Sequence, residues 1–170
     1  MNNTEFQNNL AEARKYEIAL SKWLQKKFGF YVLPTYDYSG LQKNKAPKLS
    51  GMMNSFVIPD LLCFKPERKV WVECKWKSKA ELYRKNNVYV TGIESRLFKQ
   101  YQQVGKLSGI EVKIMFLHVA ESEIRGNDLD FLSENINNYY AGDKFKNDGM
   151  VFWDFNKLHK WGNLNEIIFE

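Results

Sequence analysis

The chain has 170 residues, 44% of them hydrophobic and 26% charged, which is the composition of a single globular domain over residues 1–170 and excludes wholesale disorder. Its formal net charge of +5 favours a polyanionic partner, and the lack of any run near 18 apolar residues predicts a cytoplasmic protein with no membrane partner. Two cysteines without a CxxC spacing exclude a disulfide scaffold and a zinc site.

The first half of the chain has the hydrophobic pattern of one helix followed by strands. Apolar residues at helical spacing predict a helix over residues 4–28, which Gly29 ends. Alternating or continuous apolar runs predict strands at residues 30–36, 56–64 and 70–76. The stretch between the first two strands is a long loop, and loops of this length are usually functional or disordered.

The second half is predicted to add a helix, a strand and a C-terminal extension. Thr91 and Glu94 have the spacing of a capping box, which predicts a helix from this point to about Leu107. A strand buried on both faces is predicted next, at residues 110–119. The later elements are expected to be a helix at residues 129–140, a strand at residues 150–155 and a short terminal helix. The predicted class is α/β, with an αβββαβ core over about residues 5–119, a mixed sheet and a C-terminal αβα extension.

Two carboxylates and one lysine are predicted to meet on the central hairpin. Alternation along residues 70–76 puts Glu73 and Lys75 on the same face, about 6–7 Å apart. Asp60, directly after Pro59, opens the preceding strand, and the hairpin brings it alongside. Taken singly, Asp60 is a turn residue and Glu73 with Lys75 is a surface charge pair. Together they predict a magnesium site, because Mg²⁺ commonly takes one or two carboxylates and a nearby lysine can orient or deprotonate an attacking water.

This combination resembles the motifs of the PD-(D/E)xK nuclease superfamily. Pro59-Asp60 matches the first half-motif and Glu73-Cys74-Lys75 the second, with twelve residues between Asp60 and Glu73. The αβββαβ order is also the core of that superfamily. The resemblance implies that Asp60, Glu73 and the backbone carbonyl of Cys74 bind Mg²⁺, which Mn²⁺ can replace, and that Lys75 positions or activates water.

Glu17 is a fourth candidate for this site. It lies near the centre of the apolar stripe of the first predicted helix, and an inward-facing carboxylate needs a partner because burying an unpaired charge is costly. Many superfamily members carry a glutamate on this helix, so the resemblance implies that Glu17 supports the metal. The alternative is a salt bridge or a solvated gap in the stripe.

Basic and aromatic side chains elsewhere are candidates for partner contacts. The candidate phosphate contacts are Lys43, Lys45, Lys48, Arg84, Lys85, Arg96 and Lys99. A solvated surface explains them about as well. The aromatic residues near the C-terminus that are candidates for a dimer interface are Phe152, Trp153, Phe155, Trp161 and Phe169, although core packing explains them equally.

The residues and the resemblance together predict a magnesium-dependent DNA nuclease that acts as an endonuclease. The compact chain is similar in size to Holliday-junction resolvases and to small phage or mobile-element nucleases, which implies a prokaryotic or phage-encoded protein, branched or structured DNA as substrate, and a homodimer as the acting form. The alternative is a catalytically inactive nuclease-fold module that binds nucleic acid or a protein partner.

Overall fold

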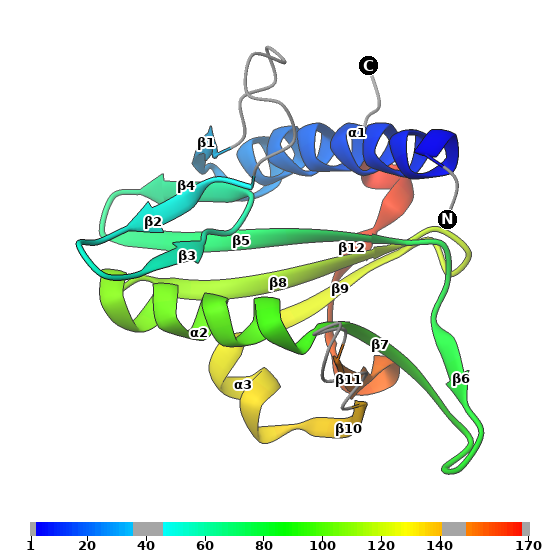
Figure 1. The fold of residues 1–170 in the computed structure, drawn as a ribbon. Coiled ribbons are helices and arrows are strands. Elements are labelled where there is room, and N and C mark those ends of the chain that lie inside the picture. The colour runs from blue at the N-terminus through cyan, green and yellow to red at the C-terminus, as the bar shows by residue number, and fades with distance from the viewer. Residues whose placement is uncertain (1–2, 36–45, 141–148, 168–170) are drawn as a thin grey trace.

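The computed structural model describes residues 3–35, 46–140 and 149–167 of the protein (Figure 1). The helices are α1 (Asn3–Phe28), α2 (Ser95–Ser108) and α3 (Leu129–Glu134), with single 3-10 turns η1 (Phe155–Lys157) and η2 (Leu164–Glu166). The strands are β1 (Tyr31–Pro34), β2 (Lys48–Ser50), β3 (Ser55–Val57), β4 (Leu61–Lys65), β5 (Arg68–Lys77), β6 (Glu81–Tyr83), β7 (Val88–Glu94), β8 (Glu111–His118), β9 (Glu123–Asp128), β10 (Ile136–Tyr140), β11 (Met150–Asp154) and β12 (His159–Asn163).

A six-stranded sheet in the order β1-β4-β5-β8-β9-β12 forms the centre of the molecule. Its two middle strands, β5 and β8, are parallel, while their neighbours pair antiparallel. A parallel pair needs a crossover connection, and α2 lies within the one between β5 and β8. Helix α1 lies on one side of this sheet and α2 on the other (Figure 1). The mixed sheet is confirmed, and the order α1-β1-β4-β5-α2-β8 confirms the predicted αβββαβ core. The strand predicted at residues 56–64 is divided into β3 and β4, and β2, β6 and β7 are additional.

The alternation predicted along β5 holds on both faces of the sheet. Val70, Val72 and Cys74 belong to the core cluster that contains Leu20 and Leu24 of α1. Trp71 points to the other face of β5 and packs against a second core cluster, which contains residues of α2. Strands β4 and β5 form the expected hairpin, with Glu67 at a φ of 65° in its turn. The hairpin places the start of β4 beside the middle of β5.

The prediction that Thr91 begins a helix is wrong. Residues 88–94 form β7, in which Thr91 pairs with Trp153 of β11, and α2 begins only at Ser95. Glu94 is the N-cap residue of that helix, and its side chain makes no capping hydrogen bond. The pairing partner lies some sixty residues later in the chain, so the local sequence carries no signal for it. Strand β7 belongs to a second sheet, in the order β10-β11-β7-β6.

The C-terminal extension contains more strands than the predicted αβα order. Helix α3 ends at Glu134 and not near residue 140, because residues 136–140 pair with β11 as β10. Strands β9 and β12 extend the central sheet beyond β8.

Two of the aromatic residues near the C-terminus, Trp153 and Phe155, are core residues. Trp153 is 1% exposed, contacts the rings of Phe98 and Phe116, and donates its indole N–H to the Leu132 carbonyl. Phe155 is also buried. Trp153 and Phe155 thus follow the core-packing alternative. Phe152 and Trp161 are partly exposed, and Phe169 lies outside the described residues.

In the part of the chain that the structure describes, no helix combines the length and the apolar composition needed to cross a lipid bilayer.

Candidate active site

Asp60, Glu73 and Lys75 lie together where β4 begins beside β5. Asp60 is 6% exposed, and its Oδ2 accepts a hydrogen bond from the backbone N–H of Cys74 at 2.9 Å. Glu73 is 1% exposed, and its Oε1 pairs with Nζ of Lys75 at 2.5 Å. The lysine side chain is partly open to solvent. The hairpin therefore brings two buried carboxylates and one partly exposed lysine side chain into one place.

The segment that leads into Asp60 is held by hydrogen bonds from two other elements. Thr35, just after β1, donates from Oγ1 to the carbonyls of Pro59 and Asp60, at 2.8 and 2.9 Å. Its backbone N–H also donates to the Asp60 carbonyl. On the other side, Oε1 of Gln100 on α2 accepts from the backbone N–H of Val57 at 2.7 Å. These contacts fix the backbone on which the Asp60 carboxylate is carried.

Glu17 of α1 belongs to the same electrostatic cluster. Its carboxylate is raised in pKa to about 7, first by burial and then by the charge of Glu73, although Lys75 and Arg14 act in the opposite direction. The Oε2 atoms of Glu17 and Glu73 are both buried and, within the described structure, have no hydrogen-bond partner. Helix α1 thus places a third carboxylate within electrostatic range of the hairpin, where the sequence predicts it.

The remaining groups of the cluster respond to the same crowding of negative charge. Burial raises the pKa of Asp60 well above its ordinary value, and the charges of Glu73 and Glu17 raise it further. Burial alone would lower the pKa of Lys75, but Glu73 and Asp60 outweigh it and the pKa is raised. Three carboxylates share one ammonium group, so the cluster has an excess of negative charge when all three are ionised.

The donor set fits a hard divalent cation. Among the described residues, no group of three or more His, Cys, Asp or Glu side chains is arranged as a ready-made metal cage. Magnesium, however, usually binds through one or two carboxylates and keeps several waters. Two buried carboxylate oxygens without partners, on Glu17 and Glu73, are the kind of atom that such an ion and its waters satisfy.

We expect Glu17→Gln to stabilise the metal-free protein at pH 8 and to have little effect at pH 5. The pKa of Glu17 is raised in the folded state, so the folded protein binds the extra proton and its stability falls as pH rises from about 4.5 to about 7. The full effect has an upper bound of about 3 kcal/mol, and glutamine removes it. Thermal unfolding in EDTA at both pH values measures the difference.

The matched control for this experiment is Glu12→Gln on the same helix. Glu12 is exposed to solvent and pairs only with Lys15, at 2.5 Å, among the described residues. Its substitution should change the melting temperature slightly and equally at the two pH values. A gain for Glu17→Gln that is the same at pH 5 and pH 8 would show that the carboxylate is not buried against Glu73.

The candidate phosphate contacts are spread over several elements. Lys48 lies on β2, Arg84 and Lys85 at the β6–β7 turn, and Arg96 and Lys99 on α2, all exposed. The β6–β7 hairpin extends away from the central sheet (Figure 1), which puts its turn far from the middle of β5. Lys43 and Lys45 lie outside the described residues. One further basic residue, Lys77, has no motif in the sequence but lies on β5 two residues beyond Lys75.

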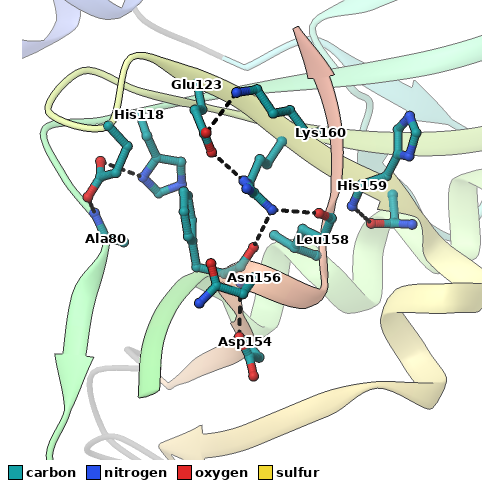
Figure 2. A network of polar contacts seen from close by, with 12 residues as sticks. Ala80, His118, Glu123, Asp154, Asn156, Leu158, His159 and Lys160 are labelled. Atoms are coloured by element: carbon teal, nitrogen blue, oxygen red, sulfur yellow. Dashed lines mark hydrogen bonds and ion pairs between the residues drawn. The ribbon is translucent and has the colours of Figure 1, made fainter. Parts of the chain in front are cut away.

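The two histidines, His118 and His159, lie on β8 and β12. His118 is 0% exposed at the end of β8, with its ring 4.8 Å from that of Phe155, and burial lowers its pKa to about 4. It lies beside a network in which Arg125 joins Glu123 to the Leu158 carbonyl (Figure 2). His159 is an exposed residue of β12 whose backbone N–H donates to Asn127.

Comparison with known proteins supports the fold and gives no relative in sequence. No protein-family model matches the chain, and no curated protein matches it. Among solved structures, it is similar to Hjc, a Holliday junction resolvase from the archaeal hyperthermophile Archaeoglobus fulgidus, with a TM-score of 0.53 and 12% identity over 84% of this chain and 88% of that one. A nuclease from a fusellovirus has a TM-score of 0.46 and 15% identity over 98% and 90% of the two chains. The chain therefore shares the fold of the archaeal resolvase, a restriction-endonuclease-like mixed α/β fold.

Proposed function

We propose that the protein is a magnesium-dependent DNA endonuclease, with Asp60, Glu73, Lys75 and Glu17 as its active-site residues. The observation that supports this most strongly is the convergence of these four side chains at one point of a nuclease fold. Each residue alone has an ordinary structural explanation. Together they present buried carboxylate oxygens without partners, which suit a bound cation, and one ammonium group, which suits a phosphate.

The proposed metal ligands are Asp60, Glu73 and the backbone carbonyl of Cys74, with Glu17 in support. When bound there, Mg²⁺ or Mn²⁺ would supply positive charge for the phosphate and lower the pKa of a coordinated water. The hydrogen bond from the Cys74 N–H fixes one oxygen of Asp60. The ion pair with Lys75 fixes one oxygen of Glu73. The chain thus holds its donor oxygens in place before any substrate arrives.

Lys75 is the residue proposed to act on the reacting groups. Hydrolysis joins a water oxygen to phosphorus and breaks the bond from phosphorus to one sugar oxygen; the water loses a proton and the sugar oxygen gains one. In the metal-free protein the raised pKa of Lys75 keeps its amine protonated. As an ammonium group it is a donor, suited to orienting the attacking water or a phosphate oxygen and offsetting negative charge there.

The test is incubation of the pure full-length protein with circular, linear, single-stranded and four-way-junction DNA. Each substrate is offered Mg²⁺, Mn²⁺ or EDTA, and an Asp60→Asn variant purified in the same way controls for contaminating nucleases. We expect cleavage with either metal and none in EDTA, and nicking or linearising of the circle as the sign of an endonuclease. Binding of DNA without cleavage under every metal would instead identify an inactive nuclease-fold module.

Branched DNA is the substrate that we propose, with the protein acting as a homodimer. A fold similar to that of a Holliday junction resolvase is consistent with this substrate. One active site cuts one strand, so symmetric cutting of a junction calls for two subunits. We expect a dimer by sedimentation at micromolar protein, and junction binding that weakens steeply with salt. A strict monomer that cuts linear duplex as readily as a junction would contradict this prediction.

A further inference from the structure

A cavity of about 230 Å³ lies beside the end of β5, where its first lining residue, Lys77, follows Lys75 of the candidate site by two positions. Lys77, Lys79 and Glu81 line it from the end of β5 and the start of β6. Gly92 of β7 and Met150 and Phe152 of β11 line it from the second sheet. A water molecule occupies about 30 Å³ in the liquid, so the space holds several waters or one small polar group with part of an attached ring.

Lys77 continues the row of charged side chains that begins with Glu73. Residues 73, 75 and 77 share one face of β5, so Lys77 follows Lys75 at about 6–7 Å along the strand. This spacing is close to that of successive phosphates along a nucleotide strand. A phosphate beside Lys75 would therefore place its neighbour on the strand within reach of Lys77.

The Lys77 ammonium group is half-buried and lacks a counter-ion. No carboxylate of the described residues lies within ion-pair distance of it, although Glu81 and Glu94 act on it from further away. Burial, and then the charge of Lys75, lower the pKa of Lys77, while these two glutamates act in the opposite direction. His118 of β8, its register partner, is buried and offers no negative charge. An anion in the adjacent cavity would supply the missing counter-charge.

The backbone around Lys77 is fixed by the turn that follows β8. The carbonyl of Lys77 accepts from the N–H of Val119 at 3.0 Å, and the carbonyl of Ser78 accepts from Ala120 at 2.9 Å. The N–H of Ala80 donates to a carboxylate oxygen of Glu121 at 3.0 Å, beside His118 (Figure 2). Three hydrogen bonds therefore tie the end of β5 and the residues after it to the turn between β8 and β9.

The wall of the cavity from β7 and β11 carries the ring of Phe152 among Val90, Thr91 and Met150. Phe152 is the register partner of Gly92, and its ring lies against the glycine backbone. A Cβ atom at residue 92 would stand 2.6 Å from Cδ1 of that ring, so only glycine permits this contact. The Lys77 ammonium group suits the charged phosphate of a nucleotide, and the Phe152 ring suits its less polar sugar or base.

We propose that this cavity is a subsite for the nucleotide next to the cleavage point, in which Lys77 binds the phosphate and the wall of Met150 and Phe152 contacts the sugar or base. The inference rests on the proposed nuclease function and extends it. The scissile phosphate lies at Lys75 and the neighbouring phosphate at Lys77, so the end of β5 reads the backbone of the strand being cut.

The test compares Lys77→Gln with Lys69→Gln in the full-length protein. Lys69 is exposed and lies on the same face of β5, four residues before Glu73, so the second variant removes the same charge from the same strand. Binding to a four-way junction and to linear duplex is measured with Ca²⁺ in place of Mg²⁺ over a range of salt. We expect Lys77→Gln to weaken binding about tenfold. It should also reduce by about 1 the slope of the logarithm of the binding constant against the logarithm of the salt concentration. Lys69→Gln should leave both quantities unchanged.

A second measurement locates the contact on the DNA. Substrates carry one neutral methylphosphonate, placed on either side of the mapped cleavage position. At one of the two positions the change should weaken binding by the wild type and have no further effect on Lys77→Gln. Equal binding by the two lysine variants, in a protein that cuts DNA, would overturn the subsite and leave the nuclease. A wild type that neither binds nor cuts any of these DNAs would overturn both.

Discussion

Asp60→Asn is expected to reduce cleavage by about 10³-fold or more while the protein remains folded and binds DNA. The substitution removes the charge of a proposed metal ligand. The metal that would stabilise negative charge on the reacting phosphate would then no longer be held in place. Asparagine keeps an oxygen that can accept the hydrogen bond from the Cys74 N–H. Alanine would leave that buried donor unsatisfied, at a cost of about 1–3 kcal/mol, and would confuse a loss of stability with a loss of function.

The metal-free stability of this variant provides an independent readout. Burial and the charges of Glu73 and Glu17 act against an ionised Asp60, so its neutral replacement should unfold at an equal or higher temperature in EDTA. Added Mg²⁺ should raise the melting temperature of the wild type and not that of the variant. Asp130→Asn, at an exposed residue of α3, is the control. Full cleavage by Asp60→Asn would remove Asp60 from the site.

The sequence predicts the parts of this fold whose signal is local. The helix over residues 4–28 appears as α1, because its apolar residues recur along one face. The strand over residues 110–119 appears as β8, because burial on both faces gives it a continuous apolar run. The hairpin before Glu73 is equally local, since a short turn joins its strands. The candidate site follows from it: alternation and one turn are enough to place Asp60, Glu73 and Lys75 together.

The second sheet is the part that the sequence does not predict. Strand β6 pairs with the nearby β7, and β10 pairs with β11, but the sheet forms only when β7 pairs with β11, some sixty residues later in the chain. Thr91 and Glu94 match a helix start by spacing, yet strand pairing with β11 takes precedence over that local preference. The same long-range pairing forms the cavity wall beside Lys77. A lysine in a charged stretch has no distinguishing pattern until the second sheet is placed against it.

Lys75→Ala is expected to lower the single-turnover cleavage rate by about 10²–10⁴-fold and to change DNA affinity by only a few-fold. The ammonium group lies beside Glu73 at the centre of the carboxylate cluster, so its proposed contribution is made to the reacting groups in the transition state more than to the bound ground state. The rate is measured with excess protein and Mg²⁺. The dissociation constant is measured with Ca²⁺, at a temperature where circular dichroism shows both proteins folded.

The folding control is needed because the substitution also removes the cation paired with the buried Glu73. Lys75 is partly exposed, and loss of this pair should cost about 1–3 kcal/mol in the metal-free protein. Lys75→Arg keeps the charge but not the compact ammonium group, so it should restore stability better than it restores the rate.

Lys77→Gln is expected to give the opposite pattern and is the sharpest comparison for Lys75→Ala. Both lysines lie on one face of β5, two residues apart, and both substitutions remove one positive charge. Removing a ground-state phosphate contact lowers affinity with a smaller effect on the single-turnover rate, whereas removing a transition-state contact lowers the rate with a smaller effect on affinity. Equal losses of rate and affinity in both variants would show that Lys75 is a phosphate contact like Lys77 and has no separate part in the chemical step.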